Sequence, residues 1–337
     1  MRRTLWWAER LALLLFAAIL LPGATSAASA PVTSAEVAVV PEPARASVVI
    51  PSTDDTTTSQ PSVPMLAMPP APAAPTPAAA RIPAVEAQIV ALYGYPGIPA
   101  MGALGAYEPD DAAIEAARLA RQFDAANGSR YAVGALQLIT SVAQPYPMAD
   151  GSYLGRMSTE QIATYVEVAR RHGVLLILDL QIGMADPVAE LQRLRPFLAE
   201  PFVHIALDPE FAMQRKGGQP GERIGSLDAS DVNRVSHELS AIVSERGLPG
   251  KLLVLHQFRA DMLTSTEQYE NFEGVTRIVD MDGWGAQWIK LANYDSYSLA
   301  AYSQRPGIKL FYDWDQPLLS VEQLLALPRM PDLVIYQ

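Results

Sequence analysis

The stretch FVHIALDPE, residues 202–210, decides the fold of this chain. It is apolar through most of its length, it lacks strict alternation, and it ends in two carboxylates. Such a run suits a strand that is buried on both faces, as in a parallel sheet covered by helices. Seven further runs share the pattern, and each ends in acids, amides, aromatics or a histidine. These runs span residues 89–96, 131–139, 174–181, 251–258, 275–284, 308–315 and 332–337.

Segments with helical spacing separate these runs. Start signals at Pro109, at Ser158 with Gln161, and at Asp186 predict three helices. The five expected helices cover residues 111–123, 162–171, 188–198, 228–246 and 321–327, and the helical pattern is weaker in residues 260–269 and 286–303. Alternation of strand and helix up to eight strands over about 250 residues is typical of a TIM (β/α)8 barrel. We predict such an α/β barrel over residues 84–337, without a regular eighth helix.

An open, doubly wound sheet is the alternative architecture. A glycine-rich phosphate loop after the first strand would distinguish it. Gly94, Gly97, Gly102 and Gly105 cluster at this place, but their spacing fits neither the dinucleotide-binding motif nor the Walker motif. The barrel is therefore the preferred prediction.

The first 83 residues have a different composition. Arg2 and Arg3 precede an apolar stretch at residues 11–21 and then small residues, which predicts a signal peptide over residues 1–30. An uncleaved N-terminal membrane anchor is the alternative, although about twenty apolar residues are needed to span a bilayer. Residues 31–83 hold 12 of the 28 prolines and predict a disordered tether. We therefore expect a secreted or envelope-tethered protein.

Composition excludes several classes of chemistry and of partner. The chain has no cysteine, so it has no disulfide, no thiol nucleophile and no thiolate metal site. A net charge of −11 disfavours nucleic acid as a partner. Of the four histidines, only His256 falls at the end of a predicted strand, so we expect no metal and no other cofactor. We also predict a monomer.

Candidate functional residues gather at the predicted strand ends, which is where parallel barrels place their active sites. Side chains alternate along a strand, so residues two positions apart, such as Asp208 and Glu210, can point into one cavity. The substrate-binding candidates are Tyr93, Tyr95, Gln137, Asp179, Gln181, His256, Gln257, Trp284, Tyr312, Asp313, Trp314 and Tyr336. The catalytic candidates are Glu210, Asp208, Asp282 and Asp280.

The motif Asp208-Pro209-Glu210 carries the clearest chemistry. Two carboxylates at the end of one strand repel each other, which raises one pKa and gives a protonated acid beside an ionised partner. Cleavage of a glycosidic bond needs such a pair. We predict that Glu210 is the acid, because its longer side chain reaches further into the cavity. The structural alternative is that Asp208 caps the following turn and that Glu210 is solvated.

The D-x-E motif at the end of the fourth strand, the export signal and the strand-end aromatics together make the chain resemble two families of glycoside hydrolase barrels. These are the chitinase family 18 and the Chalaropsis-type lysozyme family 25. The resemblance implies that Glu210 is the proton donor and that Asp208 orients or polarises the reacting group. The chain differs from the longer chitinase signature at Val203 and Ala206.

Strand-end aromatic rings such as Trp284 and Trp314 favour a sugar ligand, and we expect a cell-envelope or extracellular polysaccharide as the substrate. Two alternatives remain open. In the first, the barrel binds a glycan or peptide without catalysis, because Glu210 lacks a second carboxylate at the proper spacing. In the second, aspartates such as Asp280 and Asp282 hold a hard divalent ion for hydrolysis.

Overall fold

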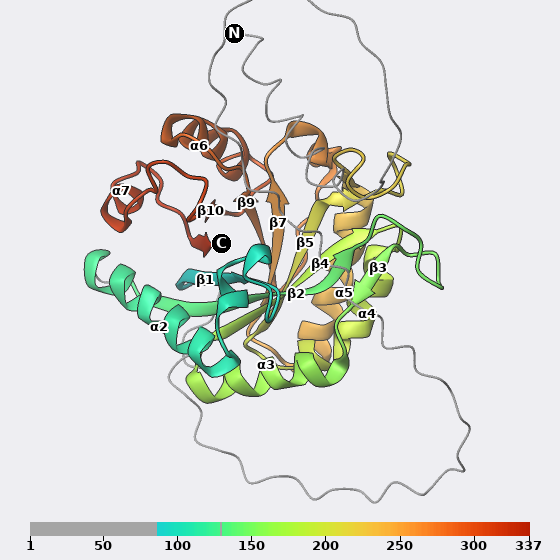
Figure 1. Cartoon of the computed structure of the whole chain (residues 1–337), viewed down its shortest axis with the longest axis horizontal. Coiled ribbons are helices and arrows are strands. Elements are labelled where there is room, and N and C mark those ends of the chain that lie inside the picture. Colours follow the sequence, from blue (N-terminus) through green and yellow to red (C-terminus); the bar gives the residue numbers. More distant parts are fainter. Residues whose placement is uncertain (1–85, 129) are drawn as a thin grey trace, which may run out of the picture.

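Eight parallel strands close into a barrel in the computed structural model, which describes residues 86–128 and 130–337 (Figure 1). The barrel strands are β1 (Gln88–Gly94), β2 (Ala132–Ala143), β4 (Leu175–Gly183), β5 (Val203–Ala212), β7 (Lys251–Gln257), β9 (Val275–Met281), β10 (Arg305–Leu310) and β11 (Leu333–Tyr336). Each strand pairs in parallel with the next, and β1 closes the ring by pairing with both β2 and β11. All eight predicted strands are present, and the TIM-type α/β barrel is confirmed.

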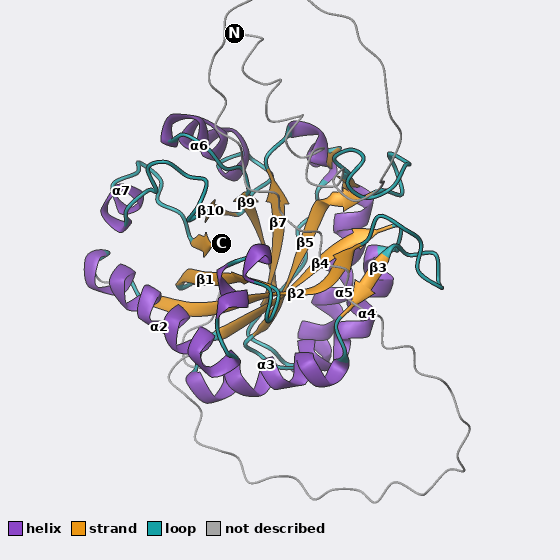
Figure 2. Cartoon of the chain, in the orientation of Figure 1, coloured by secondary structure: helices purple, strands orange, loops and turns teal. Residues whose placement is uncertain are grey.

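Helices lie outside this ring of strands (Figure 2). They are α2 (Pro109–Ala126), α3 (Thr159–His172), α4 (Pro187–Leu198), α5 (Ala229–Arg246), α6 (Gln287–Asn293) and α7 (Val321–Leu325). The expected start signals are used: Ser158 and Gln161 form a capping box on α3, and the Asp186 carboxylate accepts the N–H groups of Val188 and Ala189 on α4. The two segments with weaker patterns are less regular. Between β7 and β9 the described chain forms two short 3-10 turns and a two-residue strand in place of a helix, and α6 continues into a π-helical turn over Tyr294–Ser298.

Three short strands were not anticipated. β3 (Leu154–Arg156) adds to β2 in the antiparallel direction, and β6 (Leu227–Asp228) pairs with β8 (Leu263–Thr264). Two predicted runs also end earlier than expected: β9 stops at Met281 and β10 at Leu310. After β10 the chain turns, because the carboxylate of Asp315 accepts the N–H of Phe311 at 2.8 Å.

Helix α2 packs closely on β2, and Gly134 makes this possible. A Cβ added at Gly134 would lie 2.8 Å from backbone atoms of Ala116 and Ala117 on α2. The contact surface is otherwise made of small and aliphatic residues such as Ala113 and Leu119, which are buried. The backbones of strand and helix therefore meet without an intervening side chain.

The predicted signal peptide at residues 1–30 and the tether at residues 31–83 lie outside the described residues. Among the residues that are described, no helix has the length and apolar character needed to cross a bilayer.

Candidate active site

A layer of polar side chains fills the interior of the barrel near the carboxyl ends of its strands. Partners in a parallel register point to the same face of the sheet, as Tyr93 with Gln137 and His256 with Asp280 do. This face is the interior, because Asp179 on β4 bonds His256 on β7 across the intervening strand β5. The layer contains Tyr93, Gln137, Asp179, Asp208, His256, Asp280, Asp282 and Lys309.

His256 is the centre of a hydrogen-bonded chain across this layer. Its Nε2 lies 2.8 Å from Asp179 Oδ2, and its Nδ1 lies 3.1 Å from one oxygen each of Asp280 and Asp282. The amide of Gln137 extends the chain by donating to Asp179 Oδ2 at 2.6 Å. The imidazole is therefore held by carboxylates on both sides, and it cannot rotate without breaking these bonds.

Lys309 supplies the second positive charge of the layer, and sequence analysis missed it. Its Nζ lies 3.2 Å from each carboxylate oxygen of Asp282 and 3.6 Å from the centre of the Tyr93 ring. A signal was present in the sequence, because a lysine between Ile308 and Leu310 in a strand buried on both faces must be enclosed. Such a lysine requires an anionic partner.

These contacts decide which groups are charged. Burial alone would lower the pKa of His256, but Asp179 and then Asp280 and Asp282 raise it well above its usual value. Burial also opposes the charge of Lys309, yet the pKa of its ammonium is raised, mainly by Asp282. Burial would raise the pKa of Asp282, but Lys309 and then His256 lower it below its usual value. At neutral pH the layer thus contains an imidazolium, an ammonium and an ionised Asp282.

The acid pair of β5, Asp208 and Glu210, has raised pKa values, in contrast to Asp282. Burial raises the pKa of Asp208 to about 7, and Asp179 and Asp282 act in the same direction against His256. Burial and then the charge of Asp208 raise the pKa of Glu210 well above its usual value. Glu210 is only half-buried by its neighbours, so its carboxyl group remains within reach of solvent. The pair therefore places a protonated acid at the mouth of the barrel.

The structural alternative for Asp208 is also visible in its contacts. Its Oδ1 accepts the backbone N–H of Glu210 at 3.2 Å, as a capping residue does. The two descriptions are compatible, because this bond uses one carboxylate oxygen and fixes the backbone that carries Glu210. Asp208 thus both fixes the backbone of Glu210 and influences the pKa of the Glu210 carboxyl.

Three buried oxygens of the layer have no hydrogen-bond partner in the protein: Gln137 Oε1, Asp179 Oδ1 and Asp280 Oδ1. Unsatisfied buried acceptors are rare, since each costs about 1–3 kcal/mol. Asp280 Oδ1 lies beside Gly307 of β10, where an added Cβ would come within 3.2 Å of it. The polar layer therefore contains buried oxygens that the protein itself does not satisfy. Such an arrangement is typical of functional sites rather than of a core optimised for stability.

The remaining predicted site residues make other contacts, and Gln181 is the register partner of Asp208. Gln257 points away from the interior and accepts a bond from the Tyr302 hydroxyl at 2.8 Å. Tyr336 stacks on Tyr312 at 5.5 Å, and the charge of Glu115 on α2 adds to burial in raising the pKa of Tyr312 to about 12. Tyr95 and Gln181 are buried, Asp313 is exposed in the turn after β10, and the Gln181 side chain is fixed by the N–H of Ala143 at 2.7 Å.

Aromatic side chains gather after β9 and β10. Trp284 lies 5.9 Å from Trp314, which in turn stacks on Phe311 at 5.5 Å. Trp284 is 45% exposed, and Trp288 at the start of α6, which sequence analysis did not select, is 68% exposed. Exposed tryptophans of this kind offer apolar faces to a ligand.

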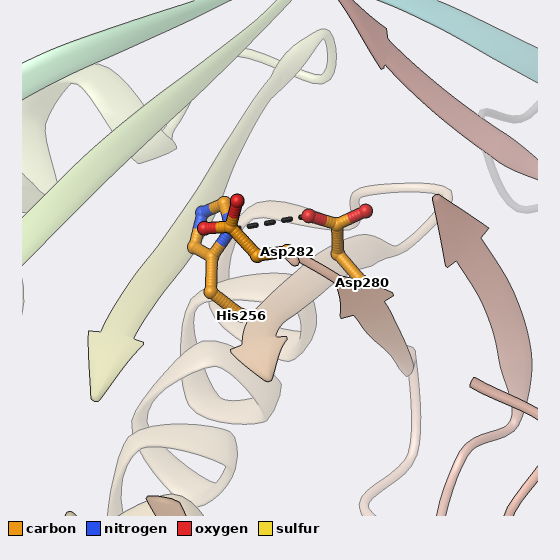
Figure 3. Close-up of side chains that lie close together, drawn as sticks. All are labelled: His256, Asp280 and Asp282. Carbon is orange, nitrogen blue, oxygen red and sulfur yellow. Dashed lines mark hydrogen bonds and ion pairs between the residues drawn. The ribbon is translucent and has the colours of Figure 1, made fainter. Parts of the chain in front are cut away.

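His256, Asp280 and Asp282 form the group with the composition of a metal site among the described residues (Figure 3). Their ligand atoms lie within 4.8 Å of one another. In this arrangement the imidazole Nδ1 bonds both carboxylates, and the ammonium of Lys309 contacts both oxygens of Asp282. A divalent ion bound here would have to displace both of these cations from the carboxylates.

Fold and site together define the chain as a TIM-type barrel whose mouth combines an acid pair, a buried imidazolium and a buried ammonium. No protein-family model matches the chain, and no curated protein matches it in sequence.

Proposed function

We propose that this protein is an exported or envelope-tethered glycoside hydrolase that cleaves a cell-envelope or extracellular polysaccharide. One observation carries the proposal: β5 brings the carboxyls of Asp208 and Glu210 together, which favours the protonated form of Glu210, while contacts of 3.2 Å to Lys309 and 3.1 Å to His256 favour the ionised form of Asp282. Glycoside hydrolysis needs this combination of an acid and an ionised carboxylate.

The roles follow from these protonation states. Glu210 donates its proton to the glycosidic oxygen of the leaving sugar. Asp208 holds the backbone of Glu210 through the 3.2 Å bond and raises the pKa of the acid. Asp282 stabilises or attacks the positively charged carbon that develops in the transition state. Asp280 keeps the His256 imidazolium in place beneath Asp282.

Two further features support a polysaccharide as the substrate. Trp284 and Trp314 form an aromatic surface after β9 and β10, and such faces pack against the apolar faces of sugar rings. The D-x-E motif at Asp208 and Glu210 resembles the acid motif of chitinase-like barrels. The strongly acidic composition disfavours anionic polymers, so a neutral or cationic glycan is the expected class.

The test is a hydrolysis screen of the purified protein against peptidoglycan, chitin, and α- and β-glucans. Glu210→Gln keeps the size of the side chain but removes the acid, so we expect hydrolysis to fall by about 100-fold or more. Glu222→Gln, on an exposed glutamate of the loop that follows β5, is the matched control and should retain full activity. The proposal is wrong if no polymer is cut, or if Glu210→Gln cuts as fast as the wild type.

The same screen separates the two alternatives. Binding of a glycan by both wild type and Glu210→Gln, without cleavage by either, would identify a binding barrel. Hydrolysis that stops after chelation and returns with a divalent ion would identify the cluster of His256, Asp280 and Asp282 as a metal site.

A further inference from the structure

The buried ion pair between Lys309 and Asp282 adjoins the His256 chain, because Asp282 also contacts His256 Nδ1 at 3.1 Å. Lys309 is the penultimate residue of β10 and Asp282 directly follows the neighbouring strand β9, so the pair joins β10 to β9. The exposed fraction is 3% for the Lys309 side chain and 8% for that of Asp282. The ammonium contacts both oxygens of the Asp282 carboxylate and holds it in place, while the 3.1 Å contact between Asp282 Oδ2 and His256 Nδ1 sets its orientation.

A second lysine, Lys290, bonds backbone carbonyl groups on both sides of the ion pair between Lys309 and Asp282. Lys290 Nζ donates to the carbonyl oxygen of Lys309 at 2.6 Å and to that of Gly283, the residue after Asp282, at 2.5 Å. It also pairs with Asp315 at 3.0 Å. The chain ends of β9 and β10 are therefore tied together, and the distance between Lys309 and Asp282 cannot relax independently.

We propose that Lys309 positions the carboxylate of Asp282 beside the acid pair of β5, as the reaction proposed above requires; the inference rests on that proposed function. The ammonium is surrounded by groups from four other strands or strand ends, and it contacts only one of the acids directly. The groups that face it are Tyr93, Asp179, Asp208, Asp280 and Asp282.

The direct contact with a single acid gives the acids around Lys309 different roles. Lys309 contacts Asp282 at 3.2 Å, whereas it acts on Asp208 and Glu210 only through space. Asp282 therefore gains most from the positive charge and stays ionised, while burial and the charge of Asp208 favour the protonated form of Glu210. Without Lys309, the proton that now belongs to Glu210 or Asp208 would be shared with Asp282.

The experiment measures the ionisation of Asp282 directly, without a substrate. The protein is labelled with aspartate carrying 13C in the side-chain carboxyl, and the Asp282 signal is identified by its loss in Asp282→Asn. In Lys309→Met, which removes the charge but keeps a long side chain, we expect the Asp282 titration midpoint to rise by about one pH unit or more. Lys309→Arg restores the charge and should return the midpoint most of the way.

Lys251→Met is the matched control. Lys251 is another buried lysine of the barrel, but it lies at the opposite end, where its Nζ bonds the carbonyl oxygens of Glu200 and Val203. Its removal should leave the Asp282 midpoint unchanged. An Asp282 midpoint that is the same in Lys309→Met and wild type would overturn the proposal.

Two further measurements test the role of Lys309. If Lys309→Met does not fold, Asp282→Asn is used with lysine labelled with 13C at Cε. In this variant the Lys309 ammonium should lose its proton at a lower pH than in the wild type. An unchanged titration of Lys309 contradicts the proposal. If the Asp282 shift is observed but no polysaccharide is hydrolysed, the positioning of Asp282 stands and only the proposed function fails. If hydrolysis is found, Lys309→Met should lower kcat more than it raises KM.

Discussion

Asp208 is a buried carboxyl that titrates near neutral pH, and this makes the stability of the barrel depend on pH. Its pKa of about 7 in the folded state lies above the ordinary value of 3.8. Because the folded state holds the proton more tightly, the stabilisation is complete below about pH 4 and is lost as the pH rises through about 7.

Replacement of Asp208 by Asn removes this titration. We expect Asp208→Asn to gain stability relative to wild type between about pH 5 and about pH 8, by on the order of a few kcal/mol at most. Urea unfolding at both pH values measures the difference. Asp313→Asn changes an exposed aspartate and should follow the wild type. An offset between Asp208→Asn and wild type that is the same at both pH values would contradict the prediction.

Sequence analysis located much of the polar layer at the level of single residues. Asp179, Asp208 and His256 were predicted to share one cavity because each lies near the end of a strand, and the structure brings them together. Lys309 was missed because it lies inside an apolar run rather than at its end. Tyr336 was placed by strand-end position alone, but the parity of its strand turns it outwards onto Tyr312.

At the level of elements, the contact between β2 and α2 depends on Gly134. An alanine Cβ there would lie 2.8 Å from the α2 backbone, so the helix must shift. We expect Gly134→Ala to lower the free energy of unfolding by about 1–3 kcal/mol, as overpacking does. Thermal or urea unfolding measures this loss.

Gly155→Ala on β3 is the matched control for this substitution. Its new Cβ would come no closer than 3.4 Å to any atom, and the nearest atom belongs to the flexible side chain of Gln144, so stability should be nearly unchanged. Equal stability of the Gly134→Ala variant and the wild type would show that α2 is not held as closely as described.

Elements with their own start signals were predictable, and elements defined by distant contacts were not. The caps at Ser158 and Asp186 marked α3 and α4 correctly, because a capping side chain acts on its own helix. The three-residue strand β3 has too few residues for a periodic pattern, and it exists through pairing with β2. The early end of β10 likewise depends on a bond from Asp315 back to Phe311.

At the scale of the whole molecule, closure of the barrel depends on β11. This strand of four residues pairs with β10 on one side and with β1 on the other. We expect a fragment of residues 84–337 to unfold as cooperatively as the full chain, whereas residues 84–332 should show no cooperative transition, because two ladders are lost together. Circular dichroism during urea unfolding distinguishes them. A cooperative transition in the shorter fragment would mean that the barrel does not need this strand.

The pairing of β1 with β11 also affects when the barrel can close during synthesis. Gln88, the first residue of β1, bonds the carbonyl oxygen of Pro331, which lies 243 positions later. A ribosome therefore releases β1 long before β11 exists, and this edge of the nascent sheet stays without its neighbour until β11 has been synthesised. Pairing of such distant segments is slow. The polar layer needs Lys309 of β10, so its ion pair with Asp282 cannot form until that strand has been synthesised.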